Sequence, residues 1–92
     1  MTPGDFAERV LAFCWELNAT ELAGYKTDRV ADQGGEPPDA AHRAGMARDV
    51  VYDQPVSLAS AISAAERLGL AIFRNASHDH IEPLGWPPPG VG

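Results

Sequence analysis

The chain has 92 residues, of which 45% are hydrophobic and 8% aromatic, and it carries a formal net charge of -6. A chain of this length can bury one hydrophobic core, which excludes a second domain. A bound metal, a protein partner or an oligomer would add to its thin stability. Seven scattered Lys and Arg residues form no basic stripe that could replace phosphate counterions, so nucleic acid is excluded as a partner. The single cysteine, Cys14, excludes an intramolecular disulfide and a zinc cluster made of cysteines.

No segment has the features of a secretory signal or of a membrane span. The first residues lack a positively charged region followed by an apolar run, so no signal peptide is expected. No stretch approaches the roughly 20 apolar residues that a membrane-spanning helix needs. We therefore expect the chain to be cytoplasmic at synthesis and to have no membrane partner.

The first helix is predicted over residues 3–17. Thr2 is a suitable N-cap, Pro3 suits the first helical position, and Asp5 can complete a capping box. Apolar residues then recur at helical spacing, at Phe6, Val10, Cys14 and Leu17. This helix is expected to support the fold and not to carry residues of a functional site.

The rest of the chain predicts short strands around one more helix. The strands are expected at 22–25, 46–52, 70–73 and 79–82, with a helix at 57–68 and a loop rich in Asp, Gly and Pro at 26–41. This order predicts an α+β fold with a small antiparallel or mixed sheet covered by helices. Residues 1–83 would form the single domain, and residues 84–92 a proline-rich tail that Trp86 could hold down.

Histidine and acidic residues gather in the second half of the chain. His78 and His80 alternate along a predicted strand, so their side chains leave the same face, and Asp79 should face the other way. His42 and Asp49 flank the start of the strand at 46–52. Two histidines and one carboxylate form a recurrent hydrolytic zinc site, although a lone histidine in a small domain is more often a surface residue.

The spacing around His42 carries a more specific signal. The segment from His42 to Asp49 fits the pattern H-x-x-G-x-A-x-D. Other matching features are Gly24-Tyr25-Lys26-Thr27, Gly34-Gly35, Leu68-Gly69-Leu70 and His80-Ile81-Glu82. Together, over roughly residues 20–83, these features resemble the D-Ala-D-Ala carboxypeptidase/endopeptidase family of zinc metallopeptidases, the peptidase M15 family.

The resemblance implies a function as well as a fold. The fold would be Hedgehog/DD-peptidase-like, and His42, Asp49 and His80 would bind zinc. A zinc-bound water would then attack a peptide bond in the stem peptide of peptidoglycan, the bacterial cell-wall polymer. Lys26 stands where the family usually has arginine and would supply charge near the substrate or the oxyanion.

The general base is where this sequence departs from the family pattern. Family members often carry an acidic residue three positions before the last histidine ligand, and Ser77 occupies that position here. Asp79 and His78 are the candidates that remain for the catalytic base. Glu82 shares the face of His80 and matches a position whose side chain orients the metal ligands through hydrogen bonds.

Two functions remain open at this point. The first is a zinc peptidase acting on peptidoglycan stem peptides, consistent with a phage or bacterial cell-wall enzyme that reaches the wall without a classical signal. The second is an M15-like binding or structural module of a virion or another assembly that has lost catalysis. Ser77 and Ala40, which replaces a usual serine, favour the second function.

Overall fold

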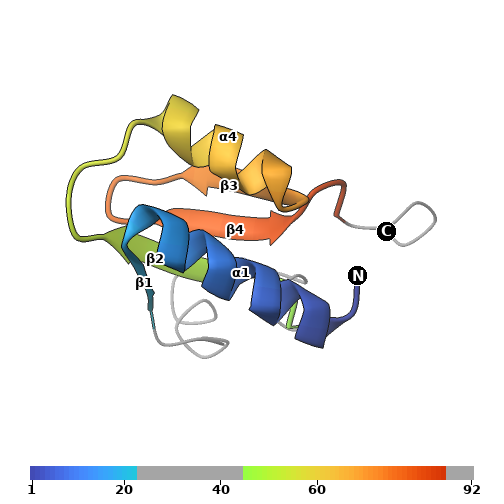
Figure 1. Ribbon diagram of the computed structural model, residues 1–92. Helices are drawn as coiled ribbons and strands as arrows, with labels where there is room; N and C mark the ends of the chain where they lie inside the picture. Colours follow the sequence, from blue (N-terminus) through green and yellow to red (C-terminus); the bar gives the residue numbers. More distant parts are fainter. Residues whose placement is uncertain (23–44, 87–92) are drawn as a thin grey trace, which may run out of the picture.

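The computed structural model describes residues 1–22 and 45–86. Two helices and four strands follow one another in these segments: α1 (Pro3–Leu17), β1 (Ala19–Glu21), β2 (Arg48–Tyr52), α4 (Leu58–Arg67), β3 (Leu70–Arg74) and β4 (Asp79–Pro83). Figure 1 shows both helices packed on a single sheet. The predicted α+β fold is confirmed, and the sheet is antiparallel.

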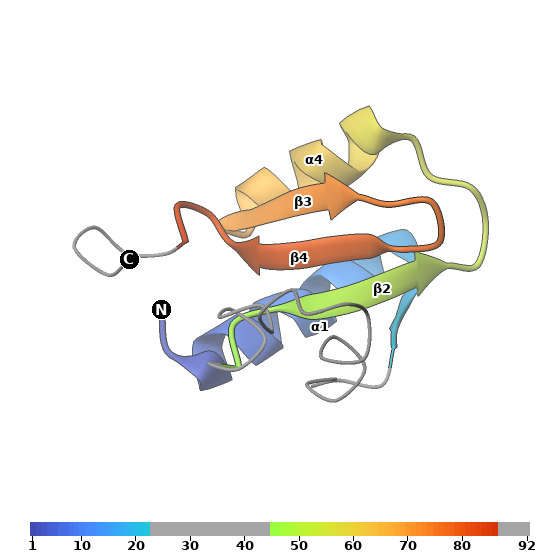
Figure 2. The ribbon, with the colours of Figure 1, turned by 180° about the vertical axis from the view of Figure 1, so that it is seen from behind.

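The sheet has the strand order β1-β2-β4-β3, and every neighbouring pair is antiparallel. Helix α1 packs against β1 and β2, and α4 packs against β3. Seen from behind in Figure 2, the strands lie in front of both helices. The sheet therefore has one face covered by helices and a second face turned away from them.

Helix α1 has the bounds that its sequence predicts, because both of its ends are capped by local chemistry. The Thr2 hydroxyl accepts a hydrogen bond from the Asp5 backbone N–H, and the Asp5 carboxylate accepts one from the Thr2 backbone N–H. Asn18 ends the helix in the left-handed conformation, with φ of 53°, which turns the chain at once into β1.

The first described strand lies ahead of the range predicted for it. Strand β1 occupies Ala19–Glu21 and pairs with β2, so it precedes the predicted range of 22–25. Leu22 lies just after the strand, where its backbone N–H still donates to the carbonyl of Asp49. Residues 23–25 are outside the described part of the chain. The early turn at Asn18 is the reason for the difference.

Helix α4 also agrees with its predicted range. Ser57 is the N-cap, and its hydroxyl accepts a hydrogen bond from the backbone N–H of Ser60. Gly69 follows the helix with φ of 71°, a conformation that side chains disfavour. A Cβ atom at Gly69 would lie only 3.0 Å from Nη1 of Arg9 on α1. This glycine allows β3 to start directly under the helix.

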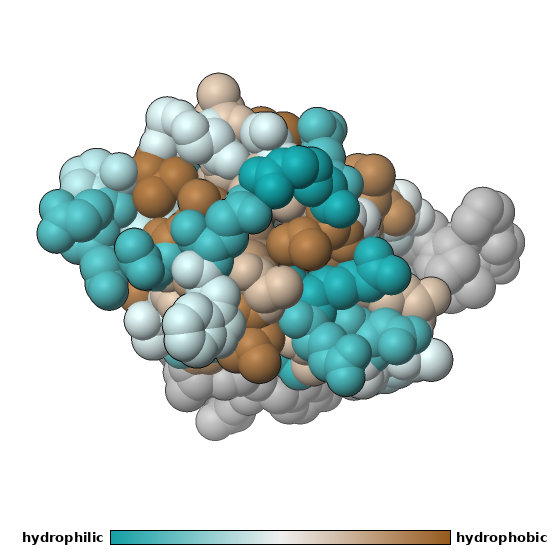
Figure 3. All heavy atoms as spheres, viewed as in Figure 1, coloured by the Kyte–Doolittle hydropathy of each residue, from teal (hydrophilic) through white to brown (hydrophobic). Residues whose placement is uncertain are grey.

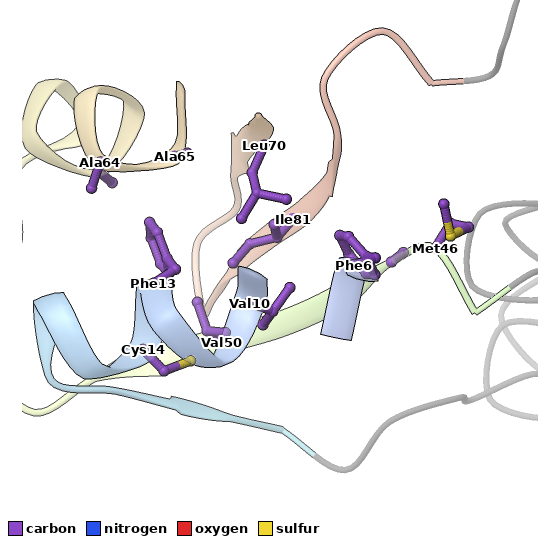
Figure 4. Close-up of a cluster of buried hydrophobic side chains, with 12 residues drawn as sticks. Phe6, Val10, Phe13, Cys14, Met46, Val50, Ala64, Ala65, Leu70 and Ile81 are labelled. Atoms are coloured by element: carbon purple, nitrogen blue, oxygen red, sulfur yellow. The ribbon is translucent and has the colours of Figure 1, made fainter. Parts of the chain in front are cut away.

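The hydrophobic core lies between the helices and the sheet. Its largest members are fully buried: Phe6, Val10 and Phe13 from α1, Val50 from β2, Leu70 from β3 and Ile81 from β4. Figure 4 shows these side chains meeting in the layer between the two helices and the strands. Burial stabilises the fold by about 1.5–3 kcal/mol for each such side chain.

The chain after β4 remains attached to the core. Leu84 donates its backbone N–H to the Gly69 carbonyl, and half-buried Trp86 packs against the core. The rest of the predicted tail, residues 87–92, is outside the described segments.

On the helix-covered side, hydrophobic residues lie among hydrophilic ones (Figure 3). Neither described helix has the length and apolar character to cross a membrane.

Candidate functional site

Asp49 and His80 lie directly opposite each other on β2 and β4. The imidazole Nδ1 of His80 is 3.1 Å from Oδ1 of Asp49. Both side chains are largely sheltered, with exposed fractions of 12% for His80 and 23% for Asp49. They sit on the sheet face away from the helices, because β4 alternates buried Asp79, Ile81 and Pro83 with partly exposed His80 and Glu82.

Glu82 contacts the other nitrogen of the same imidazole. Its Oε1 is 2.8 Å from Nε2 of His80, and its side chain is 16% exposed. The two residues are two positions apart on β4, so the strand periodicity places them on one face. The ring of Phe73, on the neighbouring strand β3, lies beside His80 with the centroids 6.0 Å apart. Among the described residues, His80 therefore contacts two carboxylates and one aromatic ring.

His78 lies at the edge of this group. Its Nε2 is 3.7 Å from Oδ1 of Asp49, and its Nδ1 is 3.0 Å from the hydroxyl of Ser77. The turn between β3 and β4 fixes the position of His78, because the His78 carbonyl accepts a hydrogen bond from the backbone N–H of Asn75. The structure thus brings together four of the predicted site residues: Asp49, His78, His80 and Glu82.

Asp79 lies on the opposite face of β4, away from these residues. Arg74 binds its carboxylate with two hydrogen bonds of 2.8 Å, from Nε to Oδ1 and from Nη2 to Oδ2. The Tyr52 hydroxyl donates a third hydrogen bond, of 2.6 Å, to Oδ2. Asp79 is 2% exposed and faces the helix side of the sheet. Its carboxylate stabilises the fold through these contacts. The prediction that Asp79 could act as the catalytic base beside Asp49 and His80 is therefore wrong.

The electrostatics of Asp79 follow from these partners. Burial alone would raise the pKa of the carboxyl group, but the hydrogen bonds from Arg74 and Tyr52 outweigh burial and hold the pKa below its ordinary value. Burial, and then the hydrogen bond to Asp79, raise the pKa of Tyr52 well above its usual range. The guanidinium of Arg74 also donates to the carbonyl of Val56, which ties the loop after β2 to the hairpin of β3 and β4.

The predicted residues His42 and Lys26 are in the segment 23–44, outside the described residues. Within residues 1–22 and 45–86, no group of three His, Cys, Asp or Glu side chains is arranged to hold a metal ion. The predicted ligand set therefore has two members, Asp49 and His80, in the described structure and its third member in the other segment.

The separation of Asp49 and His80 is that of a direct hydrogen bond, and it is also compatible with two ligands of one zinc ion. A tetrahedral zinc ion has nitrogen ligands at about 2.0–2.1 Å and carboxylate oxygen at about 2.0–2.2 Å, so two such atoms are roughly 3.4 Å apart. The observed distance between Nδ1 and Oδ1, 3.1 Å, is close to that value. The carboxylate of Glu82 on Nε2 also matches the carboxylate–histidine–metal arrangement that orients metal-binding imidazoles.

An open pocket of about 390 Å³ lies next to the site, at the end of the sheet where β2 terminates. Its lining consists of residues 50–56 and 74–79 and includes His78. Sequence reasoning missed the contacts of Arg74 and Tyr52 with Asp79, which stabilise the fold next to this pocket. The sequence signal for the contact with Arg74 was its spacing from Asp79. Two opposite charges five positions apart can face each other across a short hairpin, and Arg74 and Asp79 do pair across β3 and β4.

Comparisons with protein-family models, with curated protein sequences and with solved structures give no match for this chain.

Proposed function

We propose that the chain is a zinc-dependent peptidase that hydrolyses the stem peptides of peptidoglycan, with a Hedgehog/DD-peptidase-like fold. The observation that carries the proposal is the cross-strand pair of Asp49 and His80, whose Oδ1 and Nδ1 atoms are 3.1 Å apart. These are the last residue of the H-x-x-G-x-A-x-D motif and the histidine of the closing His-Ile-Glu segment. Residues 31 positions apart in the chain thus meet where the proposed ligand set requires it.

The contact between Glu82 and His80 supports a specific role for each imidazole nitrogen. A carboxylate oxygen only accepts hydrogen bonds, so Nε2 of His80 carries the proton that Glu82 binds. Nδ1 also faces a carboxylate oxygen, that of Asp49, so on this proposal a zinc ion takes the place of the proton between Nδ1 and Asp49. Glu82 is the positioning residue of this proposal, since it fixes both the tautomer and the orientation of the ring.

The third proposed ligand is His42, and zinc is the proposed metal. Zinc held by two imidazoles and one carboxylate lowers the pKa of a coordinated water to about 7 and polarises a carbonyl group. His78 is the residue of the described face best placed to move a proton, because its Nε2 lies 3.7 Å from Asp49. Lys26 is proposed to bind the substrate carbonyl or carboxylate as a point charge.

The proposed substrate follows from the resemblance to the M15 family and is compatible with the site. The pocket beside His78 opens to solvent along the end of the sheet, where an extended peptide could lie. The proposed place of action is the bacterial cell wall, reached through a phage or by another route that needs no classical signal.

A second candidate is a binding or structural module of an assembly, with the metal pair retained and catalysis lost. The observation that favours it is the position of Asp79 and its hydrogen bonds. Arg74 and Tyr52 occupy both oxygens of its carboxylate on the far face of β4, so Asp79 does not serve as a base next to Asp49 and His80. Among the described strands, the carboxylates on the His80 face are those of Asp49 and Glu82, which are assigned to binding and positioning.

The test is release of peptide fragments from purified peptidoglycan, analysed by mass spectrometry. Zinc-loaded protein should cleave stem peptides, and both removal of zinc and His80→Ala should abolish cleavage. Glu8→Gln, an exposed change on α1, is the control and should cleave normally. Bound zinc without cleavage would support the module, and a protein that binds no zinc would overturn both candidates.

A further inference from the structure

Trp15 is the most exposed of the large hydrophobic side chains in the described segments, with 79% of its surface accessible. Tryptophan is usually well buried, because its ring carries a large apolar area. Leu11, one helical turn earlier on α1, is also exposed, at 54%. A tryptophan placed on the surface in this way is typical of a binding site rather than of a core.

A small hollow lies beside the Trp15 ring. It has a volume of about 260 Å³ and is lined by Leu11, Cys14, Trp15, Asn18, Ala19 and Asp53. The backbone N–H of Asp53 donates to the carbonyl of Asn18, a 3.0 Å bond that holds the loop after β2 against the end of α1. The hollow is therefore built from two fixed elements. Its volume is below the roughly 300–1,000 Å³ of pockets for drug-sized ligands, which suits a single ring.

The chemistry of this hollow matches a neutral, hydroxyl-rich ring. An aromatic face covers the apolar C–H side of such a ring, while a carboxylate and an amide bind its hydroxyl groups. Within residues 1–22 and 45–86, no hydrogen bond or ion pair engages the carboxylate of Asp53, which is exposed. This carboxylate and the net charge of -6 disfavour nucleic acids, anionic lipids and sulfated glycans.

The hollow also adjoins the pocket of the candidate site. Asp53 lines both the Trp15 hollow and the larger pocket, and the latter extends to His78. His78 in turn lies 3.7 Å from Asp49. Figures 1 and 2 show that the end of α1, the end of β2 and the turn between β3 and β4 share one end of the molecule. A long ligand could contact the Trp15 hollow and the site at the same time.

From these observations we infer that Trp15, Asn18 and Asp53 form a subsite for a neutral sugar ring, and the proposed function makes an N-acetylated sugar the one to test. On the proposed function, the subsite would hold the glycan strand of peptidoglycan while the attached stem peptide extends toward Asp49 and His80. The sugar site itself requires only the residues around Trp15.

The test is an NMR titration of the full chain with chitotriose, the β-1,4-linked trimer of N-acetylglucosamine. The two tryptophans give two indole N–H signals, which Trp15→Phe assigns. The Trp15 indole signal should shift with saturation. Trp15→Ala, followed through the backbone amide signals of Asn18 and Asp53 because it lacks the indole, should weaken binding about tenfold, as the loss of an aromatic stacking contact predicts. Asp53→Ala should also weaken binding, whereas the exposed control Leu58→Ala on α4 should not.

The titration is made with a chelator present, so that its result does not depend on zinc or on cleavage. Sugar binding in a protein that neither binds zinc nor cleaves peptide would reject the peptidase and support the subsite. No saturable shift of the Trp15 indole would overturn the subsite, as would equal affinity in Trp15→Ala. It would also be overturned if free stem peptide, and not chitotriose, shifted this signal.

Discussion

The guanidinium of Arg74 donates two hydrogen bonds to the carboxylate of Asp79 across β3 and β4, both with N–O distances of 2.8 Å. Asp79 is 2% exposed, whereas the Arg74 side chain retains 31% of its surface in contact with water. Paired hydrogen bonds of this kind combine charge with fixed geometry. The contact makes Asp79 an anchor of the β3–β4 hairpin.

Asp79→Asn should therefore destabilise the fold. The change removes the negative charge that faces Arg74 and Tyr52, and the loss of one partner in a largely buried pair should lower the free energy of unfolding by roughly 2–3 kcal/mol. Urea denaturation monitored by circular dichroism gives this value. The control is Asp53→Asn, an exposed change in the next loop, which should stay within about 0.5 kcal/mol of the parent. Equal stabilities of the two variants would contradict the anchor role.

The titration of Asp79 should contribute to the loss of stability at acid pH. Its pKa in the folded chain lies below the ordinary value, because Arg74 and Tyr52 outweigh the effect of burial. A lowered pKa contributes stability above the unfolded value of about 3.9, and this stability is lost as the pH falls through the folded pKa. Thermal melts between pH 7 and pH 2 should show a smaller acid-induced loss in Asp79→Asn. Parallel curves for both proteins would refute this assignment.

Cys14 should react slowly with thiol reagents in the folded protein. Burial, assisted by the charge of Glu21, raises the pKa of its thiol to about 11, and the residue is 8% exposed. Since the thiolate is the reactive form, the protein should be nearly inert to a disulfide reagent at pH 8 and react fully in urea. The rate of absorbance change measures this directly. Rapid reaction of the folded chain would mean that the thiol of Cys14 is not buried in the core.

The parts of the fold that could be predicted from sequence are those set by local chemistry. Thr2 and Asp5 define the start of α1, and Ser57 defines the start of α4, because capping depends on residues close in the chain. The alternation of β4 also placed His80 and Glu82 on one face and Asp79 on the other. The start of β1 at Ala19 was not predicted, because the left-handed conformation of Asn18 cannot be inferred from the spacing of apolar residues.

Contacts between distant residues could be predicted only in part. The meeting of Asp49 with His80 depends on the register of β2 and β4, which periodicity alone could not supply. The sequence interpretation proposed that the two residues bind one metal ion, but it did not predict which strands pair. The partners of Asp79 were missed, because they require the pairing of β3 with β4 and the position of Tyr52 on β2. The exposure of Trp15 also depends on how α1 docks, which no local pattern determines.

Zinc titration of metal-stripped protein by calorimetry tests the central claim, that Asp49 and His80 share one zinc ion. The parent and the Glu8→Gln control should bind about one zinc per chain. Asp49→Asn and His80→Ala should show no saturable binding, and Glu82→Gln should bind about 10–100-fold more weakly, because it loses the support of the His80 ring. Zinc affinity unchanged in Asp49→Asn and His80→Ala would contradict the account.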